Sequence, residues 1–268
     1  MLAEKNLLNF FYGKHIWLTG ATSGIGLSLL ERLLPLGAKV IATGRNPDKI
    51  AHLIDEKTCF FIKCDFEQKI DAVTLKNQLR LFFDTLDIVI LNAGICEYLD
   101  DLENFNVEFF EKTFRVNYFS VLSGIEASLP LLMKSSAPYI VSMSSAVALF
   151  HGFPRAESYG ASKAAMRYTL EALQGRIKAL HPNFCISIIY PGFVKTPLTD
   201  KNNFAMPMLI SSTEAADIII RKMTKRPYTI SFPFWFIIIT KFLNLIIPTK
   251  MKILFFRKAL SSQGQKTT

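Results

Sequence analysis

A chain of 268 residues, half of them hydrophobic and 20% charged, has the length and composition of one large α/β domain. Its four cysteines are scattered without a Cys-x-x-Cys spacing, which excludes a disulfide framework and favours a reducing, cytoplasmic compartment. The net charge of +9 is uneven, because residues 221–268 hold ten Lys or Arg and no Asp or Glu. Subtracting these ten cations leaves −1 for residues 1–220, so the basic character belongs to the end of the chain.

Apolar runs of strand length alternate with helix-period segments from residue 14 to about residue 230, which predicts a doubly wound (Rossmann) parallel sheet with helices on both faces. The predicted strands are His15–Thr19, Lys39–Thr43, Thr58–Ile62, Asp87–Leu91, Tyr139–Met143, Ile186–Tyr190 and Tyr228–Ser231. The predicted helices are Gly24–Leu36, Pro47–Asp55, Asp71–Asp84, Val107–Met133, Ser158–Leu180 and Ser212–Thr224. We expect one domain over residues 1–230, with no signal peptide before it, and an apolar, basic extension over residues 231–268.

A glycine-rich turn joins the first predicted strand to the first predicted helix, in the segment Thr19-Gly-Ala-Thr-Ser-Gly-Ile-Gly26. In this context glycines let the backbone approach a pyrophosphate, and the free N–H groups of the helix start face its charge. An ordinary turn needs fewer glycines, although the motif alone does not exclude one. We therefore predict a dinucleotide site.

The end of the second predicted strand indicates which dinucleotide is bound. An acidic residue at this place accepts hydrogen bonds from the adenosine ribose of NAD. Here the place is taken by Gly44, and Arg45 follows. A guanidinium suits a 2′-phosphate through charge-assisted hydrogen bonds, so we predict that NADP(H) is preferred over NAD(H), the alternative being a solvated surface arginine.

The segment Tyr159-Gly-Ala-Ser-Lys163 places a phenol and an ammonium group four residues apart, on one face of a predicted helix. A phenol has an ordinary pKa of about 10, too high for proton exchange at neutral pH, and a nearby cation lowers that pKa. The same spacing also occurs by chance. Upstream, Ser144 and Ser145 directly follow the fifth predicted strand, where one hydroxyl can donate to a substrate oxygen and the other can cap the chain.

Together these motifs resemble the short-chain dehydrogenase/reductase family over residues 14–230. The matching positions are Thr19–Gly26, Asp65, Asn92–Gly94, Asn117, Ser144–Ser145, Tyr159–Lys163, Pro191–Gly192 and Thr196. The resemblance implies an oxidoreductase that interconverts a carbonyl and an alcohol, with hydride exchanged with a nicotinamide. It also implies a homodimer or homotetramer, with contacts through the two long helices.

The resemblance assigns four catalytic residues by position. Tyr159 is the acid/base, Lys163 binds the nicotinamide ribose and lowers the Tyr159 pKa, Ser145 orients the substrate, and Asn117 holds a water of a proton relay. Fourteen positions separate Ser145 from Tyr159, one more than is typical of the family, so Ser144 stays an alternative. The implied cofactor contacts are Gly20, Thr22, Ser23, Gly24, Ile25, Gly26, Arg45, Asp65, Asn92, Ala93, Gly94, Tyr159, Lys163, Pro191, Gly192, Val194 and Thr196.

The segment after the Pro191 turn, residues 197–210, corresponds to the substrate lid of the family and contains apolar residues such as Phe204, Met206 and Met208. It predicts a lipophilic ketone or aldehyde as substrate, unless these residues only pack on the body. A carrier-linked 3-oxoacyl substrate and a non-catalytic NADPH sensor are the alternatives. The histidines are unclustered, so we expect no metal site.

The last forty residues combine apolar and basic side chains. The run Phe232–Pro248 is interrupted by prolines and a lysine, so it falls short of the apolar length of a spanning helix. Flanking cations favour an element that lies on an anionic membrane surface, the alternative being a helix packed on protein. The apolar content and the absence of a recognised motif argue against nucleic acid.

Overall fold

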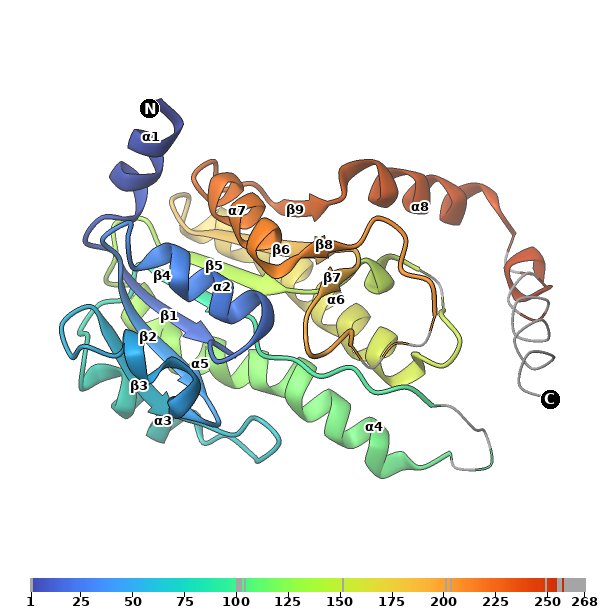
Figure 1. Ribbon diagram of the computed structural model, residues 1–268, viewed down its shortest axis with the longest axis horizontal. Helices are drawn as coiled ribbons and strands as arrows, with labels where there is room; N and C mark the ends of the chain where they lie inside the picture. Colours follow the sequence, from blue (N-terminus) through green and yellow to red (C-terminus); the bar gives the residue numbers. More distant parts are fainter. Residues whose placement is uncertain are drawn as a thin grey trace.

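A computed structural model describes residues 2–99, 103, 105–150, 152–200, 202, 204–248, 250–254 and 257. Seven parallel strands form one sheet in the order β3-β2-β1-β4-β5-β6-β9 (Figure 1). The last residues of the predicted C-terminal extension, 258–268, lie outside the described residues, as does His151. The predicted fold class is confirmed.

The strands agree with the predicted ones to within one residue at each end. The inner strands carry apolar runs that are buried on both faces, whereas the edge strands β3 and β9 are only partly buried. The central β1 pairs with β2 on one side and β4 on the other, so the glycine turn after β1 lies in the middle of the sheet. The bounds are β1 His15–Thr19, β2 Lys39–Gly44, β3 Cys59–Lys63, β4 Ile88–Leu91, β5 Tyr139–Met143, β6 Cys185–Pro191 and β9 Thr229–Phe232, with a separate small pair β7 Val194–Lys195 and β8 Ile210–Ser211.

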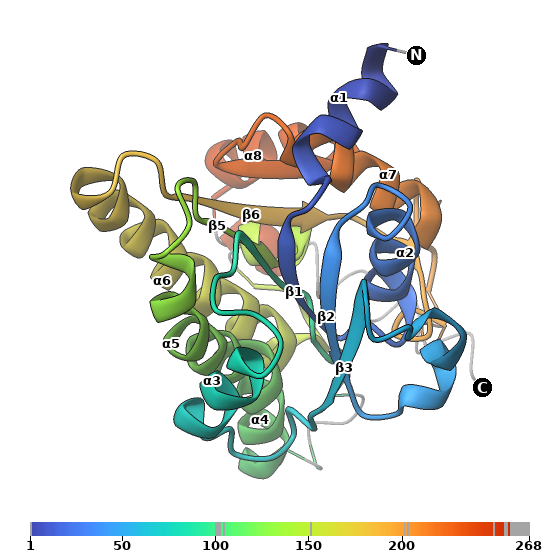
Figure 2. The same ribbon diagram turned by 90° about the vertical axis from the view of Figure 1, so that its left-hand side faces the viewer.

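Helices cover both faces of the sheet, as the view along the strands shows (Figure 2). One apolar cluster joins the sheet to α2 and α7 through residues such as Leu30 and Ile219, and the opposite cluster joins it to α3, α5 and α6 through residues such as Leu79 and Met166. The helix bounds are α1 Leu2–Phe11, α2 Gly24–Leu33, η1 Pro47–Leu53, α3 Ala72–Arg80, α4 Val107–Phe114, η3 Arg115–Phe119, α5 Ser120–Leu132, η4 Ala146–Leu149, α6 Glu157–Leu180, α7 Ser212–Met223 and α8 Phe234–Ile246.

Two predicted helices, Gly24–Leu36 and Asp71–Asp84, end three and four residues earlier than predicted, at Leu33 and Arg80, and two others differ in kind. The segment Val107–Met133 is not one regular α-helix, because a π-helical turn, Arg115–Phe119, separates α4 from α5. The segment Pro47–Asp55 forms a 3₁₀-helix that ends at Leu53. In addition, α1 lies ahead of the first predicted strand, and its Phe11 is fully buried in the cluster that holds α2.

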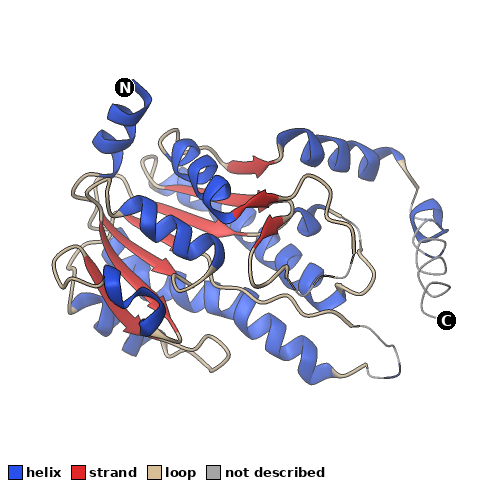
Figure 3. Cartoon of the chain, viewed as in Figure 1, coloured by secondary structure: helices blue, strands red, loops and turns tan. Residues whose placement is uncertain are grey.

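The predicted extension begins inside β9, the last strand of the sheet, and continues as α8 (Figure 3). Ile237 of α8 is 2% exposed and belongs to the cluster that also holds Ala146 and Ala148 of η4. Among the described residues, no helix is both long and apolar enough to cross a bilayer. The helix α8 is therefore attached to the body next to the segment that follows β5.

Candidate active site

A cleft of about 320 Å³ opens at the carboxyl ends of the central strands. Every predicted cofactor and catalytic residue lines it except Gly26 and Asn117, which lie directly behind its wall. Open parallel sheets bind ligands at this edge because the chain there leaves the sheet in loops whose side chains converge. The structure thus brings the predicted residues together on one surface, although they are up to 176 positions apart in the sequence, from Gly20 to Thr196.

The glycine turn forms a cradle that side chains would fill. Gly20 and Gly24 have φ values of +66° and +54°, which L side chains rarely adopt. A Cβ on Gly26 would lie 2.0 Å from the Gly20 carbonyl oxygen, so only glycine permits this close approach of helix and strand. Ser23 precedes α2 without a side-chain cap, which leaves the N–H groups of the helix start facing the cleft. These residues fit the pyrophosphate of a dinucleotide.

Asn92 fixes the loop that follows β4 against the loop that follows β1. Its Nδ2 donates to the carbonyl oxygens of Thr19 and Gly20, both at 3.1 Å. The Thr19 hydroxyl in turn accepts from the backbone N–H groups of Asn92 and Ala93, at 3.0 and 3.1 Å. The sequence analysis gave Thr19 no role of its own, although a threonine at the end of the first strand, ahead of the glycines, is the signal that could have identified it.

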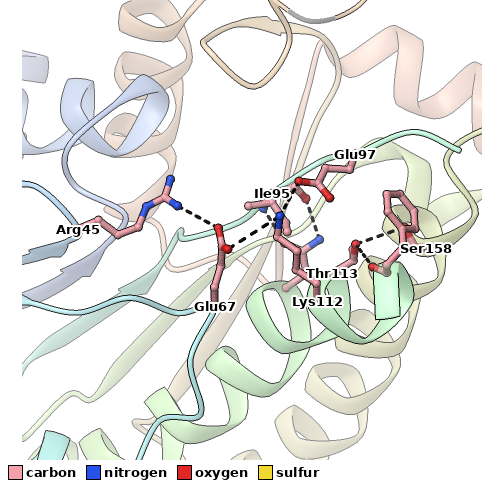
Figure 4. A network of polar contacts seen from close by, with 9 residues as sticks. Arg45, Glu67, Ile95, Glu97, Lys112, Thr113 and Ser158 are labelled. Atoms are coloured by element: carbon pink, nitrogen blue, oxygen red, sulfur yellow. Dashed lines mark hydrogen bonds and ion pairs between the residues drawn. The ribbon is translucent and has the colours of Figure 1, made fainter. Parts of the chain in front are cut away.

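At the end of the cleft that lies beside β2 and β3, Arg45 contacts an acidic residue that the sequence analysis did not consider. Its Nη1 is 2.9 Å from Oε1 of Glu67 (Figure 4). Asp65 lines the same part of the cleft, and its Oδ1 accepts from the Glu67 N–H at 3.0 Å, so it also caps the turn after β3. The predicted Arg45 guanidinium therefore lines the cleft, and the Glu67 carboxylate is its partner.

The predicted catalytic pair lies on the first turns of α6, which begins at Glu157. Lys163 is 3% exposed, and its Nζ donates to the Met143 carbonyl oxygen at 2.9 Å. Burial lowers the pKa of Lys163 to about 8 from an ordinary 10.5. Burial raises the pKa of Tyr159, the nearby Cys96 adds to the rise, and a hydrogen bond with Ser145 opposes it. The predicted lowering of the Tyr159 pKa by Lys163 stays a prediction.

The two serines after β5 have different surroundings. Ser144 is 2% exposed, and its hydroxyl donates to the Lys163 carbonyl oxygen at 3.5 Å. Ser145 is partly exposed in the cleft, where its hydroxyl hydrogen-bonds the Tyr159 phenol and accepts from the Val147 N–H at 3.3 Å. The geometry thus favours Ser145 as the group that meets a substrate, despite the extra residue in the loop before Tyr159.

Asn117 lies in the π-helical turn and is fully buried. Its Oδ1 accepts from the Ile95 N–H at 2.9 Å, and its Nδ2 donates to the Ile95 carbonyl at 2.9 Å and to the Ser162 hydroxyl at 3.1 Å. Single π-turns inside helices are frequent at functional sites. Here the turn places one amide where it joins the loop after β4 to α6, close to Lys163.

Beyond Tyr159 the wall of the cleft is aromatic. Phe204 makes edge contacts with Tyr98 and Phe193, at centroid distances of 5.8 and 6.0 Å. Phe150 and Phe153, from the loop before α6, contact each other at 5.8 Å. All five rings line the cleft, so this end can take up a bulky apolar group.

Comparisons with known proteins agree with this geometry. The family model for short chain dehydrogenases matches residues 14–206. A Myxococcus xanthus protein named uncharacterized oxidoreductase is 30% identical, covering 87% of this chain and 89% of its own, and an Acinetobacter baylyi protein named fatty acyl-CoA reductase is 29% identical, covering 82% and 76%.

Solved structures share the fold. A short chain dehydrogenase from Burkholderia cenocepacia, in complex with NADP, has a TM-score of 0.75 at 24% identity and covers 94% of this chain and 98% of its own. One from Burkholderia phymatum, in complex with NAD, has a TM-score of 0.77 at 20% identity, with 87% and 93% covered. The match of the family model over most of the chain and the order of the strands lead to one conclusion: the chain belongs to the short-chain dehydrogenase family of oxidoreductases.

Proposed function

We propose that the protein is an NADPH-dependent reductase that interconverts a lipophilic ketone or aldehyde and the corresponding alcohol. One observation carries the proposal: the Tyr159 phenol, hydrogen-bonded to Ser145 and one helical turn from buried Lys163, stands between a dinucleotide cradle and an aromatic wall.

The chain's own groups then divide the chemistry. The substrate carbonyl oxygen accepts hydrogen bonds from Ser145 and Tyr159, which stabilises the negative charge that develops on it. Tyr159 donates its proton to that oxygen as the alcohol forms, and Lys163 stabilises the phenolate that remains. Asn117 belongs to the relay that returns a proton to Tyr159. NADPH, when bound, supplies the hydride.

The test is NADPH oxidation with a panel of lipophilic aldehydes and ketones, using wild type and Tyr159→Phe. Loss of the hydroxyl should lower turnover by at least about 100-fold, because it removes the proton donor. NADPH binding, followed by nucleotide fluorescence, should stay within about 2-fold and serves as the control. Turnover by Tyr159→Phe at the wild-type rate would refute the assignment.

The cofactor preference is proposed from Arg45 and from the absence of an acid at Gly44. A Cβ at Gly44 would lie 2.7 Å from Cγ2 of Thr22, so the end of β2 is packed closely under the glycine turn. The two structural relatives are complexes with NADP and with NAD, so the proposed preference rests on Arg45 and Gly44 alone. Arg45→Ala should weaken NADPH binding and leave NADH binding unchanged; equal effects on both would contradict the preference.

The substrate class is proposed from the aromatic wall, and the name of the Acinetobacter baylyi relative supports a fatty-acyl-type carbonyl. A 3-oxoacyl group on an acidic carrier protein is the second candidate, favoured by the basic end of the chain. Comparing a free long-chain aldehyde with a carrier-linked 3-oxoacyl group separates the two. Tight NADPH binding with turnover of neither would favour a sensor.

We also propose that the protein is cytoplasmic and binds an anionic membrane surface through α8. The exposed side chains that the structure describes on this helix are all apolar, and residues 221–268 contain no acid to oppose anionic lipid. Its exposed side chains are Phe234, Trp235, Ile238, Ile239, Phe242 and Ile246.

Sedimentation with phosphatidylserine-containing and pure phosphatidylcholine vesicles tests this surface. Wild type should pellet with the anionic vesicles at low salt, and a double variant, Trp235→Ser with Phe242→Ser, should not. No pelleting by wild type would overturn the proposal, as would wild-type pelleting by the double variant. A concentration-dependent change of mass in the wild type alone would instead assign this face to contacts between copies within the expected homodimer or homotetramer.

A further inference from the structure

Four charged side chains form a row beside the cofactor cleft, which we call the ionic row: Arg45, Glu67, Lys112 and Glu97 (Figure 4). They come from the loops that follow β2, β3 and β4 and from α4, and their charges alternate. The outer pairs are direct, with 2.9 Å between Arg45 Nη1 and Glu67 Oε1 and 2.9 Å between Lys112 Nζ and Glu97 Oε1. The central contact is loose, since Lys112 Nζ is 3.9 Å from Glu67 Oε2.

The Arg45 guanidinium is thus engaged by a carboxylate at the place where the proposed cofactor carries its 2′-phosphate. A carboxylate and a phosphate use the same planar donors of arginine, and the two anions repel each other when they share one guanidinium. Both Arg45 and Glu67 line the cleft. Glu67 therefore competes with a 2′-phosphate for Arg45.

Lys112 offers the Glu67 carboxylate a second partner. Its hydrogen bond with Glu97 raises the pKa of Lys112, so it is charged at neutral pH. Its Nζ already faces the Glu67 oxygen that does not bind Arg45, and a small rotation of the carboxylate would close the 3.9 Å separation. The Glu67 backbone can stay in place meanwhile, because its carbonyl accepts from Arg115 Nη1 at 3.4 Å.

We propose that Glu67 is a specificity-determining residue for the cofactor: it holds Arg45 in the free protein and moves to Lys112 when a 2′-phosphate binds. This rests on the proposed NADPH preference. The consequence is that Glu67 moderates that preference, since binding of the 2′-phosphate must replace the Arg45–Glu67 ion pair, whereas binding of NADH need not. Lys112 limits the loss by accepting the displaced carboxylate.

The experiment compares 2′,5′-ADP with 5′-AMP, which differ only in the 2′-phosphate, by titration calorimetry at low salt. Glu67→Gln should tighten 2′,5′-ADP by about 3- to 10-fold and leave 5′-AMP within 2-fold, as expected for loss of an exposed ion pair and one repulsion. Glu126→Gln, the same change of charge on an exposed position of α5, is the matched control and should alter neither. The thermal midpoint of each variant verifies folding.

Lys112→Met should weaken 2′,5′-ADP by about 3-fold in the wild-type background and by less than 1.5-fold together with Glu67→Gln, because the displaced carboxylate is then absent. Weaker 2′,5′-ADP binding in Glu67→Gln would overturn the proposal and make Glu67 a support of Arg45. An equal change for both ligands would overturn it as well. A failure of the proposed NADPH preference gives a different result: Arg45→Ala would then bind both 2′,5′-ADP and 5′-AMP with wild-type affinity.

Discussion

Replacing Asn117 by alanine should destabilise the protein strongly, whatever it does to turnover. The substitution removes the two hydrogen bonds at 2.9 Å that satisfy the N–H and the carbonyl of Ile95, and the one at 3.1 Å to Ser162. Asn117 is fully buried, so water does not easily replace the amide. At about 1–3 kcal/mol for each buried group left unpaired, we expect a loss of about 3 kcal/mol in the free energy of unfolding.

Urea denaturation followed by circular dichroism measures this loss, and the thermal midpoint should fall by about 10 °C for a domain of this size. Asn77→Ala is the matched control, since Asn77 is exposed on α3 and its replacement should change stability by less than about 0.5 kcal/mol. If Asn117→Ala is as stable as Asn77→Ala, the amide does not clamp the loop after β4, and the reasoning is refuted.

Three further predictions concern the catalytic residues and the cradle. Ser145→Ala should lower turnover by about 100-fold and Ser144→Ala by much less; the reverse order in steady-state kinetics would assign the substrate contact to Ser144. Because the pKa of Lys163 is lowered to about 8, the unfolded chain binds more protons than the folded one between pH 8 and 10.5. Wild type should therefore gain up to about 3 kcal/mol relative to Lys163→Met across that window in urea titrations, and a constant difference would show an ordinary pKa. Gly26→Ala should abolish NADPH binding measured by fluorescence, since its Cβ would lie 2.0 Å from the Gly20 oxygen, and retained affinity would mean that α2 can shift.

The parts of the site that the sequence predicts are those set by local rules. The glycine turn between the first strand and the first helix can be recognised within eight residues. The i, i+4 spacing places Tyr159 and Lys163 on one face of α6 however that helix packs. The doubly wound sheet follows from the alternation of buried strands with helices. These features place the cofactor cradle and the phenol at the same edge of the sheet before any contact is known.

The parts that the sequence does not predict depend on side chains from distant segments. Glu67 reaches Arg45 across 22 positions, and nothing local to either residue indicates that they meet. The aromatic wall combines Tyr98, Phe153 and Phe204, which only the folded loops bring together. The π-turn at Asn117 likewise has no signal in helical periodicity, because one extra residue in a long apolar helix leaves the pattern nearly unchanged.

Burial gives Tyr159 and Lys163 pKa shifts in opposite directions, and both shifts favour the uncharged form. The phenol is therefore neutral at neutral pH, while the ammonium, with a pKa of about 8, still carries most of its charge. Donating a proton requires only the neutral phenol, which the cleft already holds against Ser145. Accepting a proton requires phenolate, which a cation must stabilise; the Met143 carbonyl uses one of the three N–H donors of the Lys163 Nζ. The protonation states of the free protein thus match those with which reduction of a carbonyl begins, and oxidation of an alcohol begins with the loss of the Tyr159 proton.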